Sequence, residues 1–165
     1  MPDRKIGREL QKLSSLPGAE VEAKQVAEIL DTQPLLGAAA TEPTIVQRMT
    51  RAKIIHFATH GLLDDINSIS SPGAIALTSA GEEDGFLTTG EIMERFALEE
   101  AAPLKAELVV LSACDTGRGD IKGEGVMGLS RAFIAAGVPS LVVSLWKVPD
   151  EATKDLMVEF YSNRG

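Results

Sequence analysis

Three apolar runs rich in β-branched residues restrict the fold of this chain more than any other feature. They are "AKIIHFATHG", "AELVVLSAC" and "PSLVVSLW". Strands that are apolar over most of their length are typical of parallel sheets covered on both faces, because both faces then need apolar side chains. Helical patterns separate the runs, as parallel connections require. The sequence therefore predicts an α/β fold with a mostly parallel central sheet flanked by helices, in which the first of these strands spans residues 53–58.

Two segments near these strands carry helix signals. The stretch "AEVEAKQVAEIL" has one apolar stripe at helical spacing, formed by Ala23, Val26, Ala27 and Leu30. In "TTGEIMERF", Thr88 and Glu91 have the spacing of a capping box, which predicts a helix that reaches about Phe96. "PTIVQRM" predicts a short helix with Pro43 in its first turn. These helices supply the layers that a buried parallel sheet needs.

The remaining segments give weaker or local predictions. In "GEGVMGLSRAFIAAG", Gly137 is expected to end a helix whose core-facing residues are Val126, Leu129, Phe133 and Ile134. "DEATKDLMVEFY" predicts a further helix with Asp150 as its N-cap. "AIALTS" predicts a short strand, and "PLLGAAATEP" a short edge strand with a turn.

Composition and charge exclude several classes of function. A formal net charge of −8 argues against nucleic acid or an anionic membrane as a partner, since both need clustered Lys and Arg. The single cysteine excludes an internal disulfide and fits a reducing, cytoplasmic setting. No apolar run approaches the length of a membrane span, and the start "MPDRKIGREL" has no signal-peptide core.

Two strands bring reactive side chains to their carboxyl ends, where ligands collect in open parallel sheets. His60 and Gly61 follow the first strand, and Cys114 and Asp115 follow "AELVVLS". A neutral imidazole within hydrogen-bond reach can help a thiol to ionise. The N–H groups of Gly61 and Cys114 can hold an oxyanion. The alternative is structural, with Cys114 as a buried small apolar side chain and His60 as a satisfied polar residue.

Metal and nucleotide sites are weaker interpretations of the same residues. His56 and His60 would lie about 13 Å apart along a strand, too far for one zinc ion, so we expect no metal and place His56 in the core or a subsite. The glycine-rich "GRGDIKGEG" matches neither the Walker pattern nor the Rossmann fingerprint. We therefore expect no cofactor.

An ordered set of motifs resembles the CHAT domain, a caspase- and separase-related family often attached to tetratricopeptide repeats in bacteria. The motifs are "HFATHGLL", "DGFLTTGEI", "ELVVLSACDTGRG" and "GEGVMGLSRAFIAAGVPSLVVSLWKV". The resemblance implies a three-layer caspase–hemoglobinase-like sandwich. It also implies a catalytic dyad of His60 and Cys114, with Gly61 in the oxyanion hole. The strict local caspase signature is absent, so aspartate specificity does not carry over.

The start of the chain departs from the family pattern. CHAT domains open with an apolar strand before the "LPGAE" helix, and "MPDRKIGRELQKLSS" does not supply it. We expect residues 1–18 to be an arm or loop and residues 19–165 to be a CHAT-like domain truncated at its N-terminus, with an end soon after Tyr161 that suggests a C-terminal cut. A neighbouring segment, strand exchange in a dimer or closure of the sheet would then fill the missing position.

The leading functional hypothesis is a cysteine endopeptidase that acts on protein or peptide substrates. Asp64, Asp65 and Asp115 flank the inferred cleft, which suggests a basic residue before the scissile bond, although Asp64 and Asp65 also fit a solvated loop tip. A catalytically silent CHAT-type interaction domain is the alternative. An esterase or acyltransferase with the same dyad is a third hypothesis.

Overall fold

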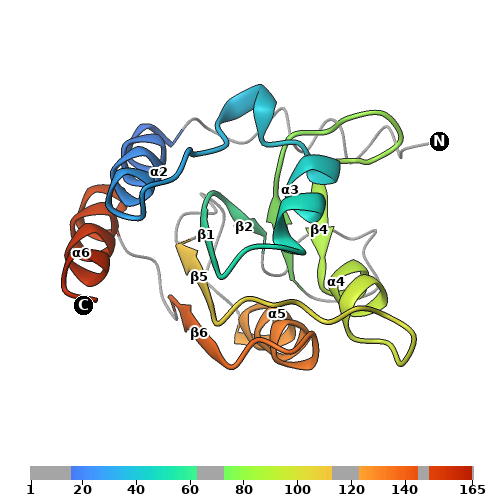
Figure 1. Cartoon of the computed structure of the whole chain (residues 1–165). Helices are drawn as coiled ribbons and strands as arrows, with labels where there is room; N and C mark the ends of the chain where they lie inside the picture. The colour runs from blue at the N-terminus through green and yellow to red at the C-terminus, as the bar shows by residue number, and fades with distance from the viewer. Residues whose placement is uncertain (1–15, 63–72, 113–122, 145–148, 165) are drawn as a thin grey trace.

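The computed structural model describes residues 16–62, 73–112, 123–144 and 149–164. Its centre is a parallel three-stranded sheet with the strand order β1–β5–β6 (Figure 1). The strands are β1 (Ile54–Ala58), β5 (Leu108–Ser112) and β6 (Ser140–Val143). All five residues of β5, the middle strand, are buried. The three apolar runs thus form the predicted parallel sheet.

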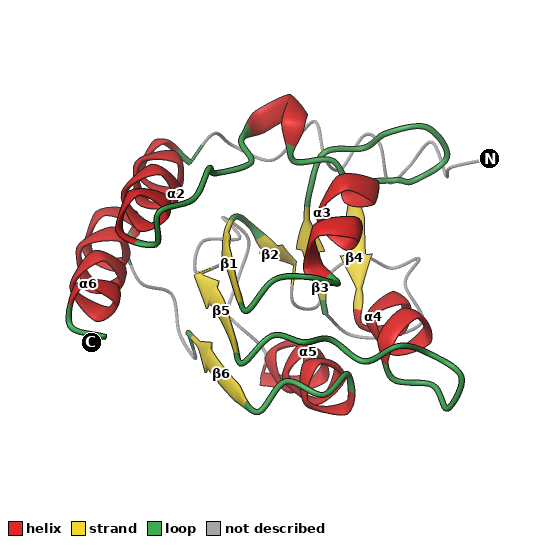
Figure 2. Ribbon diagram, in the orientation of Figure 1, coloured by secondary structure: helices red, strands yellow, loops and turns green. Residues whose placement is uncertain are grey.

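Helices cover both faces of this sheet (Figure 2). On one face, α2 (Pro17–Ile29) and α6 (Asp150–Ser162) pack Val26, Met157 and Tyr161 against Leu108 and Val110. On the other face lie α3 (Glu42–Met49), α4 (Thr89–Phe96) and α5 (Gly123–Ala135). Their core side chains include Met49, Ile92, Phe96, Leu129 and Phe133. The arrangement is the expected α/β sandwich, consistent with a caspase-like fold.

A small antiparallel sheet extends the molecule beyond the tip of β1. It contains β2 (Gly61–Leu62), β3 (Ala74–Ala76) and β4 (Phe86–Thr88) in that order. The strand β4 leads directly into α4, where Thr88 and Glu91 form the predicted capping box. The sequence predicted β3 from the run "AIALTS", in which four apolar residues follow one another. It did not predict β2 or β4, since neither strand contains an apolar run of that length.

Three local predictions were wrong. Ile134 is 61% exposed, because a position five residues after Leu129 lies about 140° around the helix from it. The N-cap of α6 is Pro149, whose carbonyl accepts the Thr153 N–H at 3.0 Å, so Asp150 is the first helical residue. The stretch expected to hold an edge strand with a turn forms no strand; it contains the short 3₁₀ helix η1 (Gly37–Ala39) and a single parallel bridge between Thr41 and Thr78.

The two ends of the described chain lie in helices on the same face. α2 begins at Pro17, two residues inside the stretch expected to be an arm. α6 ends at Ser162, and α2 and α6 pack side by side (Figure 1). Within the described ranges, no helix is both long enough and apolar enough to span a membrane.

Candidate active site

The ends of β1 and β5 lie at the same level of the sheet. The two strands are parallel neighbours, and their register pairs Ala58 with Ser112. His60 follows Ala58 by two residues, and Cys114 follows Ser112 by two residues. The two strands that precede the predicted dyad residues are therefore adjacent and parallel, and their carboxyl ends lie at the same level.

His60 lies in a segment that β3 holds in place. Its backbone C=O accepts the Ala76 N–H at 3.0 Å, and the Thr59 hydroxyl donates to the Ala76 C=O at 2.7 Å. The His60 residue is 7% exposed. Both bonds go to Ala76, so β3 holds the backbone around this histidine in place.

The next residue, Gly61, pairs with Ile75 of β3. The bond from Ala76 N–H to His60 C=O makes Gly61 and Ile75 a non-hydrogen-bonded pair of the antiparallel ladder. The Gly61 N–H is therefore directed away from β3. An oxyanion-hole donor needs an N–H that the sheet does not already use.

The other predicted site residues are Asp64, Asp65, Cys114 and Asp115, and they lie outside the described residues. The Cys114–His60 dyad, the oxyanion hole and the acidic cleft therefore remain predictions. Ser112, the last residue of β5, is buried, and its hydroxyl has no hydrogen-bond partner among the described residues. The tip of β5 thus carries a buried hydroxyl with no described partner, which the sequence pattern did not predict.

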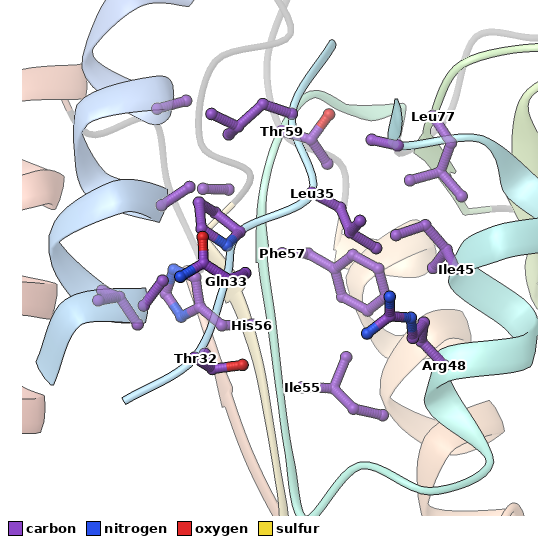
Figure 3. Close-up of a pocket in the computed structure, with 18 of the residues that line it drawn as sticks. Thr32, Gln33, Leu35, Ile45, Arg48, Ile55, His56, Phe57, Thr59 and Leu77 are labelled. Carbon is purple, nitrogen blue, oxygen red and sulfur yellow. The ribbon is translucent and has the colours of Figure 1, made fainter. Parts of the chain in front are cut away.

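A cavity of about 950 Å³ runs beside β1 (Figure 3). His60 is among the residues that line it. Its walls come from α2, α3, the segment 32–37 and every residue of β1. Most lining side chains are apolar, among them Leu35, Ile45, Ile55 and Phe57 (Figure 3). No sequence pattern indicated this cavity, because it depends on how two helices pack on opposite faces of the sheet.

A buried polar chain links the sheet to both helices of one face. Nε2 of His56 lies 2.7 Å from Glu22 Oε1, and Nδ1 lies 3.0 Å from the Tyr161 hydroxyl. The Glu22 side chain is 1% exposed. Burial raises the pKa of the Tyr161 phenol; Arg164 lowers it, and Glu22 raises it further. The sequence placed His56 in the core or a subsite; its buried side chain ties α2 and α6 to β1, and the residue also lines the cavity.

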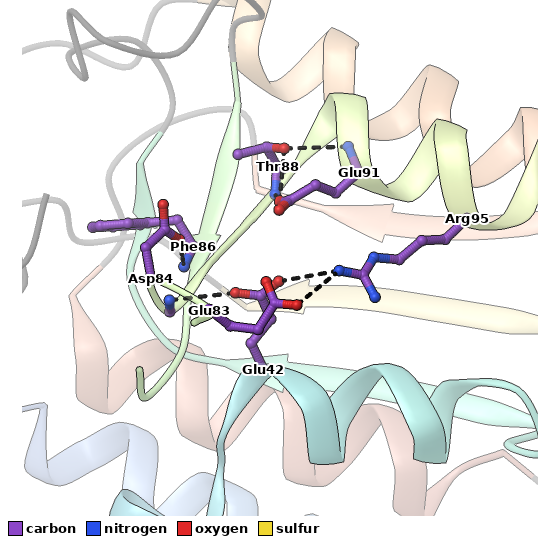
Figure 4. A network of polar contacts seen from close by, with 8 residues as sticks. Glu42, Glu83, Asp84, Phe86, Thr88, Glu91 and Arg95 are labelled. Atoms are coloured by element: carbon purple, nitrogen blue, oxygen red, sulfur yellow. Dashed lines mark hydrogen bonds and ion pairs between the residues drawn. The ribbon is translucent and has the colours of Figure 1, made fainter. Parts of the chain in front are cut away.

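A cluster of carboxylates forms where α3, the β3–β4 turn and α4 meet (Figure 4). Glu42 is buried; its Oε2 accepts the Gly85 N–H at 3.3 Å, while its Oε1 has no hydrogen-bond partner. The Arg95 guanidinium lies 3.7 Å from Glu42 Oε1 and 3.4 Å from Glu83 Oε1. Burial, helped by Glu91 and Glu83, raises the pKa of the Glu42 carboxyl to about 8.

This cluster is the one group of metal-ligand type among the described residues, with ligand atoms of Glu42, Glu83 and Glu91 within 4.8 Å of one another. The Glu91 carboxylate is already engaged, since its Oε2 accepts the Thr88 N–H and hydroxyl, each at 2.8 Å. Arg95 supplies a positive charge to the other two. The geometry is that of a structural polar cluster, in which Arg95 of α4 contacts Glu42 of α3 and Glu83.

Comparisons with known proteins agree with this fold. The CHAT domain family model matches residues 5–164. Tetratricopeptide repeat protein 28 of Mus musculus is 31% identical over 90% of this chain, and the Homo sapiens protein of that name is 30% identical over 90%. The chain spans only about 7% of the length of these relatives. Both are mammalian, so they do not support the expected bacterial setting. The family match, which covers nearly the whole chain, shows that this protein belongs to the CHAT domain family.

Proposed function

We propose that this chain is a cysteine endopeptidase domain of caspase-like type, with Cys114 as nucleophile and His60 as general base and acid. Membership of the CHAT family, which falls in the caspase-like peptidase clan, supports the reaction class. The observation that carries the proposal is the register of β1 and β5, which pairs Ala58 with Ser112. His60 and Cys114 each follow that pair by two residues, so we expect both at the same edge of the sheet.

The proposed reaction needs no cofactor. His60 takes the thiol proton, and the Cys114 sulfur attacks the carbonyl carbon of the scissile peptide. His60 then returns the proton to the leaving amine, and water hydrolyses the resulting thioester. The N–H groups of Gly61 and Cys114 hold the oxyanion. The direction of the Gly61 N–H, away from β3, leaves it available for this role.

The proposal extends to the substrate. Asp64, Asp65 and Asp115 flank the two strand tips in sequence, and carboxylates at a cleft favour a cationic side chain. We assign the domain a preference for Arg or Lys before the scissile bond. The net charge of −8 is in keeping with a basic substrate.

Peptide cleavage by the wild type and by Cys114→Ala tests the proposal. Cleavage of a diverse peptide library by the wild type, its loss in Cys114→Ala and unchanged circular dichroism of that variant are the expected results. Equal cleavage by both proteins would refute the dyad. Turnover of a small ester without any peptide cleavage would instead indicate an esterase or acyltransferase, and absence of all turnover would indicate a non-catalytic interaction domain.

A further inference from the structure

The chain passes from one sheet to the other within two residues. β1 ends at Ala58 in the parallel sheet, and β2 begins at Gly61 in the antiparallel sheet (Figure 1). Only Thr59 and His60 lie between the two strands, and the backbone bends at Thr59. This corner between the sheets therefore contains the proposed general base, and the path of the backbone there determines where the imidazole can lie.

One backbone bond of the antiparallel ladder continues into the corner. The register of β2 and β3 pairs Gly61 with Ile75, so the preceding residue, His60, stands opposite Ala76. In a regular antiparallel ladder, a hydrogen-bonded pair of this kind exchanges two N–H···O=C bonds. The Ala76 N–H donates to the His60 C=O at 3.0 Å, which is the first of these two bonds.

A side chain binds the other backbone group of Ala76. The Thr59 hydroxyl donates to the Ala76 C=O at 2.7 Å. The N–H and the C=O of Ala76 therefore bind two consecutive residues of the corner, and the two bonds run in opposite directions. Because threonine is β-branched and its χ1 angle has few favourable values, a bond to its hydroxyl also restrains the backbone that carries it.

Ala76 is a firm anchor for the corner. It belongs to β3, whose three residues are all buried and which pairs with β2 on one side and β4 on the other. Its partner in β4 is Phe86, which is fully buried, and the next residue, Leu77, donates its N–H to the Gly85 C=O at 2.7 Å. A displacement of Ala76 would disturb the middle strand of the small sheet, so the anchor restrains the corner.

Catalysis by a general base is sensitive to small displacements of that base. The imidazole must come within hydrogen-bond reach of the proton that it accepts. A misplacement of about 1 Å can reduce the rate by about 10²-fold. His60 is 7% exposed, so close packing leaves its side chain little freedom to compensate for a shifted backbone. A bond that fixes the corner can therefore contribute to the reaction without touching the reacting atoms.

We propose that Thr59 is a positioning residue for His60. Its hydroxyl, bound to the Ala76 C=O, holds the corner between the two sheets so that the imidazole stays where the proposed reaction needs it. The inference rests on the proposed peptidase function, because Thr59 acts on the reaction only through His60. The competing interpretation is a bond that stabilises the fold and has no influence on the chemistry.

Substitution of Thr59 in the full chain tests this proposal. Thr59→Val keeps nearly the same shape and removes the hydroxyl. With a peptide that the wild type cleaves, kcat should fall at least about ten-fold and KM should change less than about two-fold, because no substrate contact is removed. Labelling of Cys114 by iodoacetamide at pH 6.5 should also be slower. Thr59→Ser, which keeps the hydroxyl, should recover most of both rates.

The matched control is Thr78→Val. The Thr78 hydroxyl also donates to a backbone carbonyl, that of Gly37, and its bond has the same length of 2.7 Å. Since both substitutions remove one bond of the same type, both should lower the melting temperature by similar amounts. The bond of Thr78 does not reach the corner, so Thr78→Val should keep the kcat and the labelling rate of the wild type.

Nuclear magnetic resonance gives a measurement that does not require turnover. The chain has two histidines, His56 and His60, so protein with ¹³C-labelled histidine gives two imidazole signals, and His60→Ala identifies the signal of His60. Thr59→Val should shift or broaden the His60 signal and leave that of His56 in place. This separates the two proposals: a wild type without cleavage and with slow labelling would refute the peptidase, whereas the His60 signal still tests the positioning.

Two outcomes would overturn the role of Thr59. The first is a folded Thr59→Val variant whose His60 signal is that of the wild type. The second is an equal loss of kcat in Thr59→Val and Thr78→Val, which would show a general effect of stability. If Thr59→Val does not fold, the wild type decides: a Thr59 hydroxyl proton protected from solvent exchange supports the proposal, and one that exchanges freely contradicts it.

Discussion

Ala58, the last residue of β1, lies opposite Ser112, the last residue of β5, in a parallel ladder. From this pair, two residues of chain lead to His60 on one strand and two lead to Cys114 on the other. A parallel register of this kind is what brings side chains from distant parts of a sequence to one edge of a sheet. The proposed peptidase reaction and the proposed preference for Arg or Lys both depend on residues expected at this edge of the sheet.

Reversing the charge of Asp115 tests the proposed substrate preference. In Asp115→Lys, repulsion replaces attraction for a basic side chain, so kcat/KM for Arg and Lys substrates should fall at least about ten-fold relative to neutral ones. The measurement is a set of peptides that differ only before the scissile bond. An unchanged preference for Arg and Lys would contradict the assignment of Asp115 to the substrate cleft.

Because of the Glu22–His56 pair, alanine substitutions of two glutamates of α2 should differ widely in their effect on stability. Glu22 is buried and 2.7 Å from His56, so Glu22→Ala leaves a buried imidazole without its partner and should cost about 3 kcal/mol. Glu20 is exposed and pairs only with Lys24, and Glu20→Ala should cost less than about 1 kcal/mol. Urea unfolding of both variants measures this difference, and equal losses would contradict the structural role of the pair.

Removal of the Tyr161 hydroxyl, at the other end of the buried polar chain Glu22–His56–Tyr161, should have a smaller effect on stability. Tyr161→Phe keeps the ring beside His56 and Phe160 but removes the 3.0 Å bond to His56 Nδ1. The loss should be about 1 kcal/mol in the same urea experiment. A loss as large as that of Glu22→Ala would mean that ring packing, and not the hydrogen bond, had been disturbed.

The raised pKa of Glu42 predicts that the stability of the protein decreases as the pH rises. Its folded-state pKa of about 8 lies above the ordinary value of 4.5, so the folded protein holds the proton more tightly than the unfolded chain. The contribution of the protonated carboxyl is present below about pH 4.5 and is lost as the pH rises through about 8. Glu42→Gln mimics the protonated form and should gain on the order of 1 kcal/mol over the wild type at pH 9.

The matched control for this experiment is Glu82→Gln, an exposed residue next to Glu83. Urea unfolding at pH 5 and pH 9 should show a smaller pH dependence for Glu42→Gln than for the wild type, and no such change for Glu82→Gln. If Glu42→Gln lost stability equally at both pH values, Glu42 would be charged throughout and the Arg95 ion pair would dominate.

The backbone at Gly73 leaves no room for a side chain. It has φ +102°, and a Cβ there would lie 2.7 Å from the Gly125 carbonyl oxygen at the start of α5. Gly81 has φ +64° but nothing within 4 Å of its Cβ position. Gly81→Ala should therefore cost only about 1–2 kcal/mol of backbone strain, and Gly73→Ala distinctly more. Equal thermal-melt shifts would mean that α5 moves away at no cost.

The central sheet was predictable because its strands are apolar on both faces over most of their length. β1, β5 and β6 each show this pattern, and the helices between them impose the parallel direction. The register was not predictable. A strand that is apolar on both faces tolerates a slip of one residue, so the pairing of Ala58 with Ser112 needed the structure.

The polar features were predictable only where they are local. The Thr88–Glu91 capping box spans one helical turn and was read directly from spacing. The partners of His56 lie 34 and 105 positions away, and Glu42 meets Gly85 from 43 positions away. Glu22 did carry a signal, since a charge four residues before Val26 falls on the buried stripe of its helix. No local sequence pattern identifies the residue that pairs with Glu22.

The rate at which iodoacetamide labels Cys114 tests the proposed dyad most directly, because this is the only thiol in the chain. An ordinary thiol with a pKa near 8.5 is only about 1% thiolate at pH 6.5. We predict fast labelling of the wild type at pH 6.5 and at least about ten-fold slower labelling of His60→Ala, with both proteins folded. Slow labelling at the same rate in both proteins would contradict the account.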